Sequence, residues 1–358
     1  MELLILAGAF VLILAGAELF TNGVEWLGHR LDLGEGAVGS VIAAVGTALP
    51  ETMIPIVAIV LGTQGAGTEV SEGIGIGAIL GAPFMLSTLA MFVTGVAVLL
   101  SVRRRPSGAV MRVDTGVLGR DVRSFAVAYA LAIGAAFLPP ELAWGKLVVA
   151  AVLLGLYTLY VRAHLRAARV PDGAGLPGPL RLRHLDRHRH DREPGLSLIS
   201  LQVGVALAAI IVGAVAFVDA VRGIAGSVSL DPMIMSLVIA PIATELPEKF
   251  NSVIWVRQGK DTLALGNITG AMVFQSCIPT VVALLFAADL WAVTPSSALA
   301  FASAGIAFAS TAAIFVPMAR RGRLTGRGLL VGGIFYVAYL AIIVAGGAGM
   351  SPVAVAPP

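Results

Sequence analysis

Two short stretches place a carboxylate beside a proline in otherwise apolar sequence. "GTALPE" covers 46–51 and "ATELPE" covers 243–248. A proline inside a helix frees the carbonyl four residues before it, here that of Gly46 or Ala243. Free carbonyls, a threonine hydroxyl and a carboxylate within one turn form an oxygen-rich group, and hard cations such as Ca²⁺ and Na⁺ prefer such ligands. We therefore expect both stretches to contribute to a cation site.

The charged residues of these stretches are expensive inside a membrane. Glu51, Glu245, Glu248 and Lys249 each cost about 2.5–3.5 kcal/mol at the centre of a spanning helix. In one arrangement Glu245 pairs with Lys249 at the i,i+4 spacing, and Glu51 and Glu248 together hold one divalent cation. In the other, Glu245 is a third ligand and Lys249 extends toward an interface. The sequence leaves both arrangements open.

The composition indicates the environment in which these residues work. The chain has 358 residues, of which 58% are hydrophobic and 13% charged, and the mean hydropathy is +0.92. This is too little polar surface for a soluble protein, so we expect a polytopic membrane protein. The N-terminal apolar run begins Met1-Glu2 and lacks a basic region, so we interpret it as a retained first spanning helix.

Apolar runs separated by charged or Gly/Pro-rich breaks predict an all-α protein with ten membrane helices. All 24 Lys and Arg residues except Lys146, Arg222 and Lys249 lie in or beside the odd-numbered loops. By the positive-inside rule these loops are cytoplasmic and both termini face outward. The predicted helices are 2–27, 37–61, 73–102, 124–139, 145–164, 197–221, 231–257, 262–288, 296–318 and 328–348.

An internal repeat relates the two stretches. Residues 16–51 align without a gap with residues 213–248, at an offset of 197. Further on, "GAILGA" at 77–82 matches "GNITGA" at 266–271. The Gly-x-x-x-Gly spacing inside each segment predicts close packing of the third and eighth helices against the helices broken by proline.

Five helices in each half is an odd number, so the second half must enter the membrane from the opposite side. Inverted repeats of this kind are typical of secondary transporters, whose substrate site lies near the bilayer midplane between the halves. We therefore predict a first five-helix repeat at 1–165, a basic cytoplasmic linker at 166–196 and a second five-helix repeat at 197–358.

The two stretches resemble the alpha-repeats of the sodium/calcium exchanger family, within the calcium/cation antiporter superfamily. Each leads into a glycine-rich helix, and "RQGKDTLALGNITGAMVF" at 257–274 is similar to the segment after the second family signature. The resemblance implies that Glu51 and Glu248 bind the cation and that Thr47 and Thr244 add oxygen ligands. It also implies that the first and sixth helices move as a pair during alternating access.

Several positions depart from the family pattern. The signature serines are replaced by Ala48 and Glu245. Gln275, on the predicted eighth helix, is a polar residue that could reach the site. Glu245 with Lys249 suits proton coupling or another divalent ion. Where the later helices of the family usually offer Ser with Asn or Asp, this chain has Ala82, Leu86, Ala271 and Gln275.

We therefore predict a secondary antiporter, integral to the plasma membrane (the inner membrane of a bacterium), that exchanges a divalent cation, first of all Ca²⁺, for Na⁺ or H⁺. A cation channel and a proton-coupled exchanger of another divalent metal are the alternatives. The sequence has no H-E-x-x-H or G-x-S-x-G motif, so we expect no enzyme activity and no cofactor besides the transported ions. The expected partners are these cations and membrane lipid, not nucleic acid, and the sequence indicates no oligomeric state.

Overall fold

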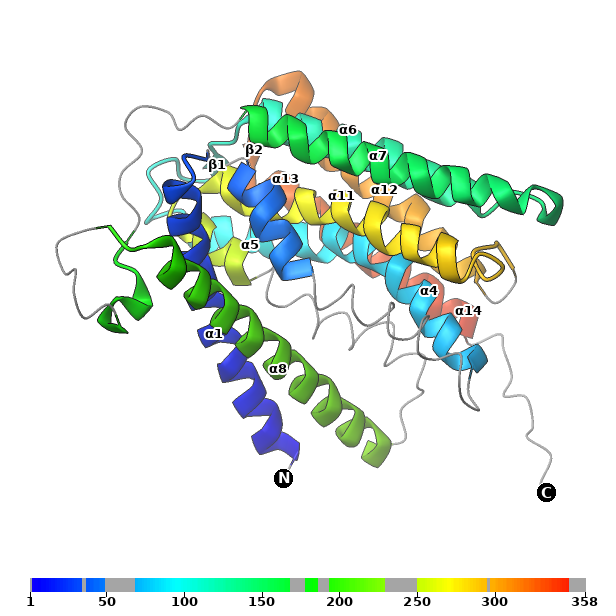
Figure 1. Ribbon diagram of the computed structural model, residues 1–358, viewed down its shortest axis with the longest axis horizontal. Coiled ribbons are helices and arrows are strands. Elements are labelled where there is room, and N and C mark those ends of the chain that lie inside the picture. Colours follow the sequence, from blue (N-terminus) through cyan, green and yellow to red (C-terminus); the bar gives the residue numbers. More distant parts are fainter. Residues whose placement is uncertain are drawn as a thin grey trace.

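The computed structural model describes residues 2–33, 37–48, 68–167, 178–185, 193–228, 250–294 and 297–347. These residues are almost entirely helical, as the all-α prediction requires (Figure 1). The elements are α1 (Glu2–Arg30), η1 (Val38–Ala43), α4 (Thr68–Met85), η3 (Leu86–Ala90), α5 (Met91–Leu100), β1 (Val110–Met111), α6 (Thr115–Ala135), η4 (Pro140–Leu142), α7 (Ala143–Ala167), η5 (Arg181–Leu185), α8 (Leu196–Val228), α11 (Asp261–Phe286), α12 (Ala298–Arg321), β2 (Leu324–Thr325), α13 (Gly326–Leu329) and α14 (Val331–Gly347).

Within the described residues, seven helices are long and apolar enough to cross a membrane. The predicted class, a helical membrane protein, agrees with this finding. The count of ten spans, the inverted arrangement of the halves and the outward termini remain predictions, as does the division into two repeats and a linker.

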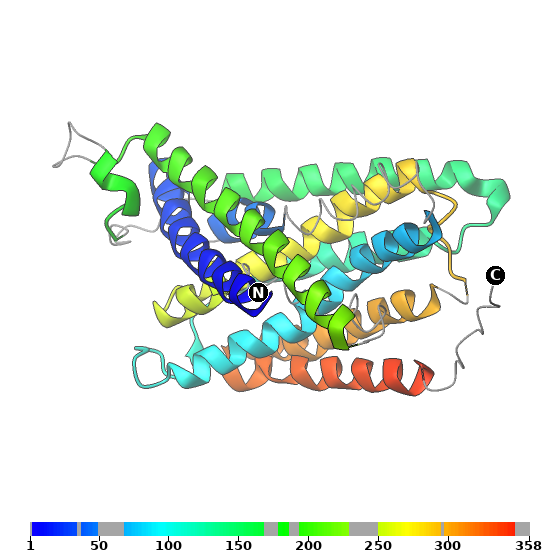
Figure 2. The same cartoon turned by 90° about the horizontal axis from the view of Figure 1, so that it is seen from below.

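The helices form a body and a separate pair. Most of them run roughly parallel to one another, whereas α1 and α8 pack together and cross this body at an angle (Figures 1 and 2). The body contains α11 at its centre, packed against α4, α6, α7 and η1. Every residue of α11 from Asp261 to Cys277 is buried, so its polar side chains are held away from lipid and need partners inside the protein.

Glycines bring α11 into backbone contact with η1, as the Gly-x-x-x-Gly spacing predicts. A Cβ atom at Gly266 would lie 2.9 Å from the Ser40 hydroxyl oxygen, and one at Gly270 would lie closer still to the Ser40 carbonyl oxygen. Real Cβ atoms essentially never approach this closely, so a side chain at Gly266 would displace the Ser40 hydroxyl and one at Gly270 would displace the Ser40 backbone. The partner predicted for the matching glycines of the third helix lies outside the described residues.

Helices α1 and α8 are joined by two equivalent contacts, each between a glycine and an isoleucine. A Cβ atom at Gly16 would lie 2.8 Å from Cγ1 of Ile210, and one at Gly213 would lie 2.8 Å from Cγ1 of Ile13. Adding the repeat offset to Gly16 and Ile13 gives Gly213 and Ile210. Such a reciprocal contact is expected of two helices related by a twofold axis.

The predicted boundaries of the fourth helix are wrong. α6 covers Thr115–Ala135 rather than 124–139. The earlier start is explained by an N-cap, because the Asp114 carboxylate accepts the backbone N–H groups of Gly116 and Val117 at 2.8 and 3.0 Å. Asp121, which the prediction places in a loop, therefore lies inside the helix.

A buried ion pair attaches the basic segment after α5 to the start of α11. The side chains of Arg105 and Asp261 are both 0% exposed. The Arg105 nitrogens Nη1 and Nη2 donate to the two Asp261 carboxylate oxygens at 2.8 and 2.7 Å, which is the bidentate geometry of strong arginine–carboxylate pairs. The backbone N–H of Arg112 donates to the same carboxylate at 2.7 Å. Nearby, β1 and β2 pair antiparallel, joining this segment to the one before α13.

Candidate cation site

Thr47 and Gln275 are the predicted ligands that lie in the described part of the chain. Both are buried, with exposed fractions of 0% and 1%. The remaining predicted ligands lie outside the described residues, so their positions stay predictions: Glu51, Thr244, Glu245 and Glu248. Within the described ranges, which omit all three of these glutamates, no group of three or more His, Cys, Asp or Glu side chains could hold a metal ion.

Thr47 joins the first signature to α11. It lies in the helical segment 44–48 that continues η1. Its hydroxyl oxygen is 2.9 Å from the Ala43 carbonyl oxygen and 3.3 Å from Oδ1 of Asn267. A hydroxyl carries one proton, so Thr47 donates it either to the Ala43 carbonyl oxygen or to Oδ1 of Asn267. A residue of the first half therefore meets a residue of the second half in the protein interior.

Asn267 is a candidate site residue that the sequence reasoning missed. It is 0% exposed, and the available signal was an amide inside the apolar run between Gly266 and Gly270. Residues four apart lie on one face of a helix, so Asn267, Ala271 and Gln275 form one side of α11. The contact with Thr47 indicates that this side faces the first signature, and it includes two positions at which the family usually has polar ligands.

Those departures from the family pattern that lie in the described residues are buried. Ala48, Leu86 and Ala271 are 0% exposed and Ala82 is 8% exposed. Leu86 begins η3, which is π-helical like η1, and π-helical turns occur frequently at functional sites. Apolar side chains therefore stand inside the protein at positions where the resemblance implies oxygen ligands.

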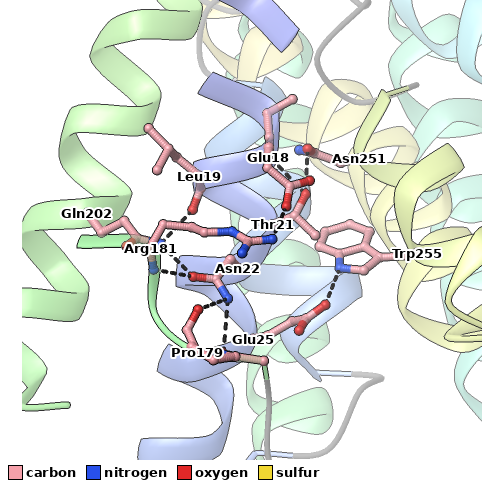
Figure 3. Close-up of polar contacts among 12 residues, drawn as sticks. Glu18, Leu19, Thr21, Asn22, Glu25, Pro179, Arg181, Gln202, Asn251 and Trp255 are labelled. Atoms are coloured by element: carbon pink, nitrogen blue, oxygen red, sulfur yellow. Dashed lines mark hydrogen bonds and ion pairs between the residues drawn. The ribbon is translucent and has the colours of Figure 1, made fainter. Parts of the chain in front are cut away.

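A second polar region joins α1 to the segment after the second signature (Figure 3). The Thr21 hydroxyl oxygen lies 2.8 Å from Oδ1 of Asn251. The Glu25 carboxylate accepts Nε1–H of Trp255 at 3.0 Å and pairs with Nζ of Lys260 at 2.6 Å. Thr21 and Glu25 are four residues apart and share a face of α1.

The neighbouring face of α1 holds the linker and α8 (Figure 3). The Asn22 side-chain amide donates to the carbonyl of Gly178 at 3.2 Å, and its oxygen accepts Nε2–H of Gln202 at 2.9 Å. Arg181 pairs with Glu18 at 2.6 Å. A cavity of about 250 Å³ lies among these groups, and its lining includes Glu18, Glu25, Arg181 and Lys260. Each carboxylate that lines it is therefore neutralised by a basic side chain.

Comparisons with known proteins agree with this architecture. The sequence profile of the sodium/calcium exchanger protein family matches residues 1–165 and 199–345. The inner membrane protein YrbG of Escherichia coli (strain K12) is 25% identical over 241 residues, which are 67% of this chain and 66% of that protein.

Solved structures of the sodium-calcium exchanger NCX_Mj share the fold. The form soaked with 10 mM Na⁺ and zero Ca²⁺ superposes with a TM-score of 0.69 at 17% identity, covering 95% of this chain and 99% of that chain. The form soaked with 2.5 mM Na⁺ and 0.1 mM Ca²⁺ gives a TM-score of 0.67 at 17% identity, covering 93% of this chain and 95% of that chain.

The fold and the family match define an integral membrane cation antiporter, and not an enzyme. The chain belongs to the sodium/calcium exchanger protein family. The resemblance drawn from the two Pro-Glu signatures is thereby confirmed.

Proposed function

We propose that this antiporter exchanges Ca²⁺ for Na⁺ or H⁺ at a single site near the bilayer midplane. Glu51 and Glu248 hold the divalent cation in this proposal, and Thr47 and Thr244 add oxygen ligands. The contact between Thr47 and Asn267 carries the proposal, because it brings the first signature to the polar side of α11. Gln275 on that side and Glu245 are the further ligands proposed.

The buried apolar positions favour H⁺ over Na⁺ as the coupling ion. Sodium ions need several oxygen ligands each, and Ala82, Leu86 and Ala271 supply none from their side chains. A proton needs only one carboxylate. The same observation supports the alternative of a proton-coupled exchanger for another divalent metal, because half of the six proposed ligands are carboxylates: Glu51, Glu245 and Glu248.

Alternating access in this proposal uses α1 and α8 as the moving pair. They cross the body at an angle (Figure 2), and in the described part of the chain the polar contacts of Thr21 and Glu25 hold α1 to the segment after the second signature. One of these joins Thr21 to Asn251, and Asn251 follows Glu248 by three residues. A displacement of α1 would therefore act on the segment that follows the second carboxylate in the sequence.

Ion flux in proteoliposomes tests the proposal. We expect Ca²⁺ uptake driven by an outward gradient of H⁺ or Na⁺, loss of exchange in Glu51→Gln and Glu248→Gln, and normal exchange in Glu141→Gln, a matched change at an exposed glutamate. Uptake indifferent to both gradients would reject exchange, and single-channel currents would favour the cation-channel alternative.

A further inference from the structure

A buried carboxylate outside the proposed cation site has an unusual set of partners. Asp121 on α6 is 0% exposed. Its Oδ2 accepts the hydroxyl groups of Ser40 at 2.7 Å and Thr269 at 2.6 Å. Its Oδ1 lies 3.0 Å from the Tyr160 hydroxyl and 2.9 Å from Nε2 of His164. We call these residues, which come from α6, α7, α11 and η1, the Asp121 cluster.

The donors around Asp121 indicate that it is ionised. An ionised carboxylate only accepts hydrogen bonds, and the two Asp121 oxygens accept from the hydroxyl groups of Ser40, Thr269 and Tyr160. An ionised carboxylate in an apolar interior is very unfavourable unless a positive charge lies beside it. Among the described residues, His164 is the one group in ion-pair contact with Asp121, and it is positive only when protonated.

The surroundings of the His164 ring favour its protonated, positively charged form. Its Nδ1 lies 3.2 Å from the Tyr160 carbonyl oxygen, and its Nε2 lies at ion-pair distance from Asp121, although not in line for a hydrogen bond. Both neighbours are acceptors. A neutral imidazole has one N–H group, whereas the imidazolium has two, so the protonated ring carries an N–H on the side of each oxygen and a positive charge beside the Asp121 carboxylate.

The elements packed around this pair bring no second formal charge into contact with it, as far as the described residues show. The segment η1 presents Ser40, α11 presents Thr269, and α7 presents Tyr160, whose ring stacks on Tyr157. The charged residues nearest to the pair along α6 and α7 are Arg120, Arg123, Arg162 and Arg166, and no ion pair joins any of them to Asp121.

The pair lies where a proton could act on the cation site. Ser40 belongs to η1, which continues into the segment carrying Thr47, and Thr269 follows Asn267 by two residues on α11. The carboxylate thus holds together the two elements whose contact forms the described part of the site. The pair is also near the ends of α6 and α7 that adjoin basic segments, the side predicted to be cytoplasmic.

We propose that Asp121 and His164 form a proton-binding site, separate from the cation site, through which cytoplasmic pH controls exchange. The control of exchange rests on the proposed function. When the pair loses its proton, the carboxylate has no neutralising partner, and the connection between η1 and α11 weakens. Exchange therefore falls as cytoplasmic pH rises through the titration of the pair.

The first test measures the protonation of the His164 imidazole directly. The chain has five histidines, and a protein that keeps only His164 is labelled with ¹⁵N-histidine in lipid nanodiscs and titrated between about pH 5 and 8, the range in which histidines change charge. We expect imidazolium signals from both ring nitrogens at the acidic end and their loss toward the alkaline end. The substitutions are His29→Gln, His184→Gln, His188→Gln and His190→Gln.

Flux measurements on the same protein decide the control of exchange. Exchange in proteoliposomes should fall severalfold as the pH rises, and the midpoint of this fall should equal the midpoint of the ring titration. His164→Gln should abolish the pH dependence of exchange, whereas His29→Gln should retain it. A ring that stays neutral throughout overturns the proton site, whether or not the protein exchanges ions. A titrating ring with a different flux midpoint, or an unchanged profile in His164→Gln, overturns the control. Should His164→Gln not fold, the comparison of midpoints in the single-histidine protein still decides. Absence of exchange at every pH rejects the proposed function and leaves the ring titration to decide the proton site.

Discussion

Replacing Thr47 by valine removes one oxygen from the described part of the proposed cation site and almost no volume. The valine keeps the shape of the side chain, but Oδ1 of Asn267, which is 0% exposed, loses the Thr47 hydroxyl at 3.3 Å as one of its polar contacts. Losing one partner of a buried polar contact costs about 1–3 kcal/mol. If this cost falls on the cation-bound state, the half-saturating Ca²⁺ concentration for exchange rises about 5–150-fold.

Thr94→Val is the matched control. Thr94 is also 0% exposed, and its hydroxyl donates to the carbonyl of Ala90 at 2.8 Å, the same bond to the preceding turn that Thr47 makes with Ala43. Thr94 lies on α5, away from α11. The measurement is Ca²⁺-dependent exchange in proteoliposomes, with the thermal unfolding of both variants as a check on stability. Equal Ca²⁺ dependence in Thr47→Val and Thr94→Val would refute the assignment of Thr47 to the site.

Two further predictions concern the framework of the site. Gly270→Ala should destabilise the protein by about 1–3 kcal/mol, because the added methyl group meets the Ser40 backbone. The control Gly305→Ala has open space around it among the described atoms, so it should be neutral or stabilise α12 by up to about 1 kcal/mol. Equal melting temperatures of the two variants would contradict the close approach of α11 and η1. Asp261→Asn should cost about 3–5 kcal/mol, because it leaves Arg105 buried without its counter-charge. Replacing both residues by apolar ones should restore much of this loss in the same unfolding assay, and a double variant as unstable as Asp261→Asn would contradict the ion-pair explanation.

The sequence predicted the features that depend on spacing. The glycines of "GNITGA" do bring α11 against η1, and the offset of 197 between the repeats reappears in the reciprocal contacts of Gly16 and Gly213. Both contacts depend on which residues share a helix face, and the spacing of residues in the sequence determines this directly. The apolar runs likewise predicted the seven described helices that are long and apolar enough to cross a membrane, whereas a cap at Asp114 makes α6 start earlier than predicted.

The partners of buried polar groups could not be predicted in this way. Nothing in the sequence around Asn267 indicates that Thr47, in the other half of the chain, lies beside it. The sequence alone places Arg105 in a basic loop, whereas its burial depends on Asp261, which lies far away in the sequence. The sequence also places Asp121 in a loop and gives no sign of its contact with His164. Each of these contacts depends on how the helices pack, and helix packing is not periodic in the sequence.

The doubled contact between α1 and α8 has a consequence for spectroscopy. Ile13 packs against Gly213 and Ile210 packs against Gly16. A shift of either helix along the other would therefore move both isoleucines away from the glycines that make room for them. The register between the two helices is therefore locked. Spin labels placed across this crossing should report one narrow distance in every ionic condition, while labels placed between α1 and α11 should report more than one.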